Sequence, residues 1–166
     1  SEFWATLIPI AVYLKHRNQP TYMKPVIFYI FFAMLINYSG NMISDYWKIL
    51  PSWMQSNTIL YNIHSIVRFI CFSLFFIGLH QPGATRIYKS LPLLSAGIFI
   101  FNFTLIDNFF NPNSLSGNLL AGEAYILLIY CMVYYLFKLR DDEVVITEEP
   151  DFWVVTGLAA YVVVNF

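Results

Sequence analysis

Charged side chains are scarce in this sequence. Aspartate, glutamate, lysine and arginine together make up 11% of the 166 residues, whereas a soluble domain carries about 25%. Hydrophobic residues make up 58%, and the mean hydropathy is +0.60. A globule of this size exposes much of its surface and could not hide so much apolar area from water. The composition therefore predicts a protein that is embedded in lipid.

Cysteines are few, and recognisable enzyme motifs are lacking. Cys71 and Cys131 lie inside apolar runs and are too few for a disulfide framework or a zinc site. His16 and His80 fall in loops on one side of the membrane and His64 in the opposite half of the bundle, so the three histidines cannot share a metal. The sequence has no H-E-x-x-H, no G-x-S-x-G and no glycine-rich phosphate loop. A net charge of −1 offers no basic surface to nucleic acid. We expect no enzymatic activity, no cofactor, no metal and no nucleic-acid partner.

Long apolar runs are what the sequence has instead. A helix needs ~20 apolar residues to cross ~30 Å of hydrocarbon. Strands of a membrane barrel would alternate over about ten residues, which these runs do not do. The pattern predicts an all-α polytopic transmembrane bundle that forms a single domain over residues 1–166. About six helices are expected, at about 3–14, 25–44, 57–79, 87–106, 119–139 and 151–166. The first and last are short for a span, so a truncated seven-helix bundle is an alternative.

Lysines and arginines gather in alternate loops. Three lie in residues 15–24, two in 80–90 and two in 138–150, whereas the intervening loops carry only Lys48. Cytoplasmic loops are the ones enriched in these residues. The sequence therefore predicts a multi-pass protein with its N-terminus outside and these three loops in the cytoplasm.

A few polar side chains fall inside the predicted helices. Arg68 lies halfway along the third helix, one turn after His64. Glu123, near the outer end of the fifth helix, is the expected partner of either residue. A bidentate Arg–Glu pair would satisfy both charges in hydrocarbon, where an isolated charge is costly.

Four asparagines share the predicted outer half of the bundle with these residues. Together they predict a polar pocket that opens to the outside and binds a ligand. The alternative is that they only join helices, because asparagines and buried ion pairs can fix helix packing without binding anything. The sequence leaves both interpretations open. The candidate ligand-binding residues are Arg68, His64, Glu123, Asn37, Asn41, Asn62 and Asn102.

The last apolar segment carries a resemblance. From Glu149 to Tyr161 it reads EPDFWVVTGLAAY, with Gly157 and Tyr161 four residues apart. Together with the basic loop after the first helix, this segment resembles a family of bacterial seven-helix membrane proteins, some of which precede sensor histidine kinases. The resemblance implies a location in the bacterial inner (plasma) membrane and a role as a signalling input domain. That family favours an acidic residue in the third helix, whereas the stretch from Tyr61 to Arg68 has none.

These features predict a sensory or receptor-like domain with an outward-facing polar pocket that is coupled to a cytoplasmic module. The alternative is a structural or accessory subunit of a larger membrane complex. Its partners would then be other membrane subunits or further copies of the chain, besides the lipid bilayer. A transporter fits less well, because it needs a polar path through the inner half, where the sequence is mostly aliphatic and aromatic.

Overall fold

The computed structural model describes residues 10–11, 19–46, 48–51, 56–105, 116–140 and 149–165. Within this part of the chain it contains five α-helices, one short 3-10 helix and no strand. The 3-10 helix η1 spans Thr21–Met23. The α-helices are α2 (Lys24–Tyr46), α3 (Thr58–Gly78), α4 (Thr85–Leu105), α5 (Gly117–Lys138) and α6 (Pro150–Asn165). The predicted all-α class is confirmed, and each of these helices lies within two residues of its predicted bounds.

The predicted count of six helices is not matched in the described part of the chain. The first predicted helix, 3–14, lies outside the described residues except for positions 10 and 11, which are helical. Four helices, α2 to α5, are long and apolar enough to cross a membrane. Helix α6 has 16 residues and is too short to count among them. The chain is therefore a membrane-type helical protein with at least four candidate spans.

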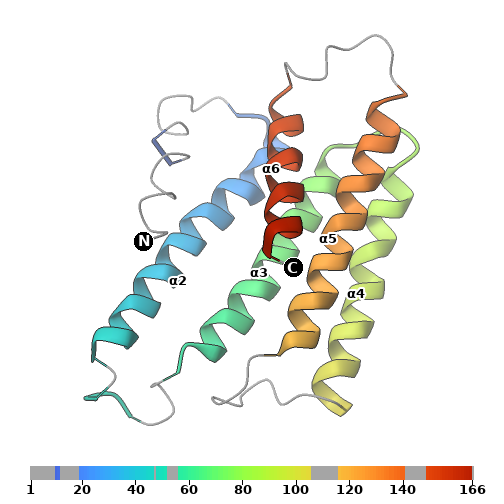
Figure 1. The fold of residues 1–166 in the computed structure, drawn as a ribbon. Coiled ribbons are helices and arrows are strands. Elements are labelled where there is room, and N and C mark those ends of the chain that lie inside the picture. The colour runs from blue at the N-terminus through green and yellow to red at the C-terminus, as the bar shows by residue number, and fades with distance from the viewer. Residues whose placement is uncertain are drawn as a thin grey trace.

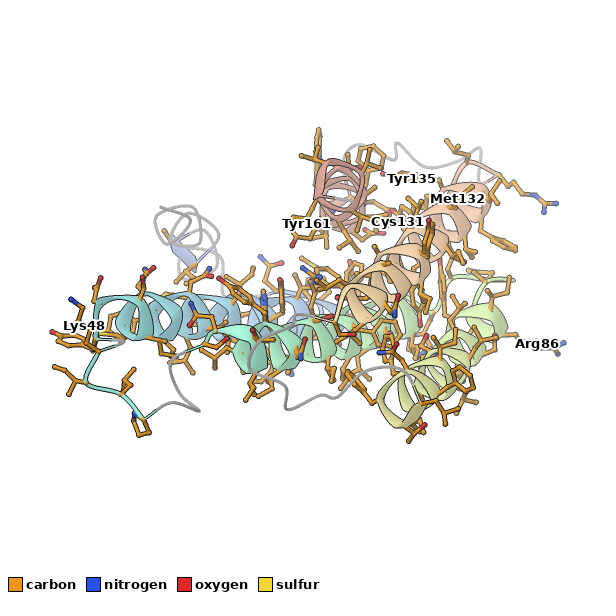
Figure 2. The ribbon with its side chains drawn as sticks, turned by 60° about the horizontal axis from the view of Figure 1, so that its bottom comes forward. Lys48, Arg86, Cys131, Met132, Tyr135 and Tyr161 are labelled. Carbon is orange, nitrogen blue, oxygen red and sulfur yellow. The ribbon has the colours of Figure 1, made fainter. Side chains whose placement is uncertain are left out.

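The helices run up and down, and α3 lies at the centre. It contacts α2, α4 and α5, while α6 packs mainly against α5. Figure 1 shows α6 in front of α3, with the starts of α2, α4 and α6 at the same end of the bundle. Figure 2 shows Lys48 and Arg86 on opposite sides of the molecule. We call the end where α2, α4 and α6 begin the basic end, because the helix directions place there Lys24, Arg86, Lys89, Lys138 and Arg140.

An aromatic core joins α3, α4 and α5 near the basic end. Phe76 of α3 is fully buried and stacks on Tyr130 of α5, with 4.8 Å between the ring centroids. Phe75 and Tyr88 pack against Phe76 with centroids 5.2 and 5.5 Å away. Aromatic rings bury a large area each and prefer such offset or edge-to-face contacts. Their packing holds the central helices at fixed positions.

A proline inside α4 is accommodated by a neighbouring helix. Pro92 has no N–H and cannot bond to the carbonyl of Tyr88, four residues earlier. The hydroxyl of Tyr130 on α5 donates to that carbonyl at 3.2 Å. No water in hydrocarbon could replace this donor, so a side chain from another helix satisfies the freed carbonyl.

The turn after α3 is tight and brings a polar side chain inside. His80 and Gly83 both have positive φ, 49° and 81°. A Cβ on Gly83 would lie 2.6 Å from Cε1 of Phe137, so another residue there would have to displace this ring and adopt a strained positive φ. Between them the turn buries Gln81, whose amide nitrogen donates to the carbonyl of Tyr134 on α5 at 3.2 Å.

Candidate functional site

A bidentate ion pair joins α3 and α5 in the middle of the bundle. Arg68 Nε lies 2.6 Å from Glu123 Oε1, and Arg68 Nη2 lies 2.7 Å from Glu123 Oε2. Glu123 is fully buried and Arg68 is 4% exposed. The sequence predicts this pairing, because two opposite charges inside hydrocarbon persist only when each compensates the other.

Further polar groups from three helices complete the network around this pair. The hydroxyl of Ser65, one turn before Arg68, donates to Glu123 Oε2. Arg68 Nη1 donates to the hydroxyl of Tyr161 on α6 at 2.5 Å, and Figure 2 shows Tyr161 on the side of α6 that faces α3. Tyr29 on α2 also interacts electrostatically with the guanidinium. Four helices therefore meet at one arginine.

His64 lies beside this network without joining the ion pair. Its ring stacks on Tyr29 of α2, with centroids 5.5 Å apart and planes 10° from parallel. Phe32 covers it from the same helix at 6.5 Å. His64 Nε2 is buried and has no hydrogen-bond partner among the described residues. A buried polar atom without a partner is costly, which makes this nitrogen a candidate contact for a ligand.

The four asparagines are distributed over three helices, α2, α3 and α4. Asn102 on α4 is buried and donates to Ser116 Oγ at 3.1 Å. Ser116 is the N-cap of α5 and accepts the N–H of Leu119, so Asn102 joins α4 to the start of α5. Asn62 is 1% exposed on α3.

On α2, Asn41 is exposed and Asn37 half-buried, and no hydrogen bond between described residues links either of them to the ion pair. Of the seven candidates, the structure thus brings together Arg68 and Glu123, with His64 one turn away.

A second polar cluster lies at the basic end, where the sequence is expected to be mostly aliphatic and aromatic. The hydroxyl of Tyr88 donates to Gln81 Oε1 at 2.7 Å. The hydroxyl of Tyr134 donates to Asp151 Oδ2 at 2.9 Å. Lys138 forms ion pairs with Glu149 and, at 3.9 Å, with Asp151. The contacts of Tyr134 and Lys138 attach the start of α6 to α5.

Sequence reasoning missed Ser65 and Tyr161 at the ion pair. Ser65 was detectable in principle, because it lies three residues before Arg68 and so on the same helix face. Tyr161 had no such signal. Its contact depends on where α6 packs and how it is rotated, and the chain has 12 tyrosines that could have supplied it.

The arrangement can hold charge and hydrogen bonds, and it has no donor set for a metal. Within the described ranges, no group of three or more His, Cys, Asp or Glu side chains could bind a metal ion. Comparison of the chain with protein-family models, with curated proteins and with solved structures finds no match. The resemblance to the seven-helix family therefore stays a prediction.

Proposed function

We propose that this chain is a membrane-embedded sensory domain of the bacterial inner membrane. In this proposal the polar network around Arg68 receives the stimulus, and α6 passes its state to a cytoplasmic module. The observation that supports it is the contact of Arg68 with both Glu123 on α5 and Tyr161 on α6. Because one guanidinium binds both partners, a change in the Arg68–Glu123 ion pair also changes the hydrogen bond between Arg68 and Tyr161 of α6.

Helix α6 is suited to such movement. It packs mainly on α5, and polar contacts attach it at several levels. The hydroxyls of Tyr135 and Thr156 lie 2.8 Å apart, between the Tyr161 contact and the attachment of Asp151. Its outer face, including Trp153, is exposed. A helix held on one side can exchange one set of hydrogen bonds for another, and a ligand shifts such an equilibrium by binding one state better.

The stimulus that fits this network is a small ligand with a negatively charged or hydrogen-bonding group. An anionic group would compete with Glu123 for the guanidinium of Arg68. The unpartnered Nε2 of His64, one turn away, would supply a second hydrogen bond. The bias of lysine and arginine toward the basic end supports a cytoplasmic location of that end, with the ligand entering from outside.

The test replaces the chromosomal gene by an allele that encodes Arg68→Gln. The transcript levels of this strain are compared with those of the wild type and of a deletion strain. A sensory domain predicts that Arg68→Gln changes the same set of transcripts as the deletion, in the same or the opposite direction. Lys48→Gln, at the far end of the bundle, is the control and should match the wild type. Immunoblots of membranes confirm equal protein levels, and Tyr161→Phe serves as a milder variant if Arg68→Gln does not accumulate. A deletion strain with wild-type transcripts would exclude a signalling role.

An accessory subunit is the second candidate, and the poor burial of α2 favours it. Only 17% of the residues in its 18-residue apolar stretch are buried, compared with 50% in the corresponding stretch of α3. Lipid or another protein chain would cover the exposed face, which includes Phe28 and Leu35. Cross-linking in native membranes distinguishes the two, because an obligate subunit is captured with a stoichiometric partner, whereas a stand-alone domain is recovered alone.

A further inference from the structure

A cavity of about 450 Å³ lies at the basic end of the bundle. It is an open cavity lined by residues from the turn after α3, from the end of α5 and from the first turn of α6. Its volume falls within the ~300–1,000 Å³ typical of small-molecule sites. One wall is apolar, formed by Leu79, Pro82 and Phe137, and the other carries the charged side chains of Lys138, Arg140 and Asp151.

Side chains of both charges lie at this cavity among the described residues. Lys138 is paired with Glu149 and lies 3.9 Å from Asp151. Arg140 is exposed and forms no ion pair with a described residue. Among the described residues that line it, the cavity thus offers cations, Lys138 and Arg140, and a carboxylate, Asp151, at separate positions. A headgroup that carries both a negative and a positive group can use both kinds of partner.

The carboxylate of Asp151 can accept a further hydrogen bond. The residue is 5% exposed, and its Oδ2 accepts the hydroxyl of Tyr134 and faces Lys138. No hydrogen bond between described residues ends on its other oxygen, Oδ1. A buried carboxylate is most stable when both oxygens accept hydrogen bonds, so Oδ1 is a ready acceptor for an ammonium group.

We propose that this cavity binds the headgroup of a zwitterionic phospholipid with a primary amine, of the phosphoethanolamine type. The guanidinium of Arg140 binds the phosphate, and Asp151 accepts the ammonium. The apolar wall contacts the beginning of the acyl chains. The position fits, because the cavity lies where α5 and its apolar span end and where headgroups of a bilayer begin.

This site is separate from the Arg68 network and does not depend on the proposed sensory function. A lipid bound at this site would nevertheless affect the position of α6. Because Asp151 belongs to the first turn of α6, a lipid bound there ties the start of this helix to Arg140, just beyond the end of α5.

The test is native mass spectrometry of the purified full chain in detergent, titrated with three lipids of identical acyl chains. The ethanolamine lipid should bind about tenfold more tightly than the choline or the glycerol lipid, which corresponds to ~1.4 kcal/mol. Arg140→Gln should weaken the ethanolamine and choline lipids alike, because both lose the phosphate contact. Asp151→Asn should reduce the ethanolamine lipid to the affinity of the choline lipid, since only the ammonium contact is lost.

The matched control is Arg86→Gln, an exposed cation at the same end that does not line the cavity. It should leave all three affinities unchanged. Preference for the glycerol lipid, equal binding of all three, or displacement of the lipid by soluble phosphoethanolamine at equal concentration would each overturn the proposal. Arg140 is on the surface, so Arg140→Gln keeps the fold and decides the question if Asp151→Asn does not accumulate.

Discussion

Replacing Arg68 by methionine should strongly destabilise the bundle. The substitution removes the two hydrogen bonds of 2.6 and 2.7 Å to Glu123 and the only positive charge that compensates this carboxylate among the described residues. Glu123 is fully buried and, among the described residues, keeps the hydroxyl of Ser65 as its hydrogen-bond donor. Removing one partner of a buried pair costs about 3–5 kcal/mol of unfolding free energy. A domain is stable by only ~5–15 kcal/mol in total, so this loss is large.

The double variant Arg68→Met with Glu123→Leu should be much less harmful than the sum of the single variants. With both charges removed, no uncompensated carboxylate remains, and apolar side chains of similar size can fill the space. We expect a loss of at most ~2 kcal/mol from the hydroxyls of Ser65 and Tyr161 that lose their partners. The coupling energy of the double-mutant cycle should therefore reach at least ~2 kcal/mol.

Reversible unfolding in mixed micelles, followed by tryptophan fluorescence and circular dichroism, measures all four free energies. Arg86→Met is the control, because Arg86 is exposed at the start of α4. It should change the unfolding free energy by no more than ~0.5 kcal/mol. Two results would show that the residues do not act as a pair: a free-energy loss in the double variant equal to the sum of the two single losses, or a loss below ~1 kcal/mol for Arg68→Met.

Four further substitutions test other parts of the structure. Tyr161→Phe removes the acceptor of the 2.5 Å bond from Arg68 and should cost about 1 kcal/mol in the same unfolding assay; an unchanged free energy would contradict this contact. Gly83→Ala places a Cβ 2.6 Å from a neighbouring ring at φ 81° and should cost ~1–3 kcal/mol. Gly97→Ala, with nothing within 4 Å, should be neutral or stabilising by up to ~1 kcal/mol; equal effects of the two would refute the steric argument. A cysteine at exposed Lys89 should react with a membrane-impermeant reagent only from the cytoplasmic side, and labelling from outside would reverse the topology.

The helices of this protein could be predicted from the sequence because lipid imposes a length. A span needs ~20 apolar residues, and the breakers between runs, such as Gln81-Pro82-Gly83, stand out against them. The bounds of α2 to α6 followed within two residues. The first predicted helix, 3–14, falls mainly outside the described residues, so the count of six is not matched.

The ion pair could be predicted for a similar reason. An arginine in mid-membrane needs a carboxylate, and Glu123 is the obvious candidate in the neighbouring spans. Hydrogen bonds of neutral groups are different, because they depend on how each helix is rotated. Asn102 lies at the same predicted level as Glu123 but turns toward Ser116. The contact of Tyr161 depends likewise on the packing of α6, which apolar composition does not specify.

Pro92 in α4 and Tyr130 in α5 are expected to vary together in evolution. Pro92 leaves the carbonyl of Tyr88 without its usual helical donor, and the hydroxyl of Tyr130 donates to this carbonyl, so a chain that loses the tyrosine loses that hydrogen bond unless the proline changes too. In descendants of this sequence, the two residues should be kept or replaced together. Tyr130→Phe should therefore be tolerated far better in a chain that already carries Pro92→Ala.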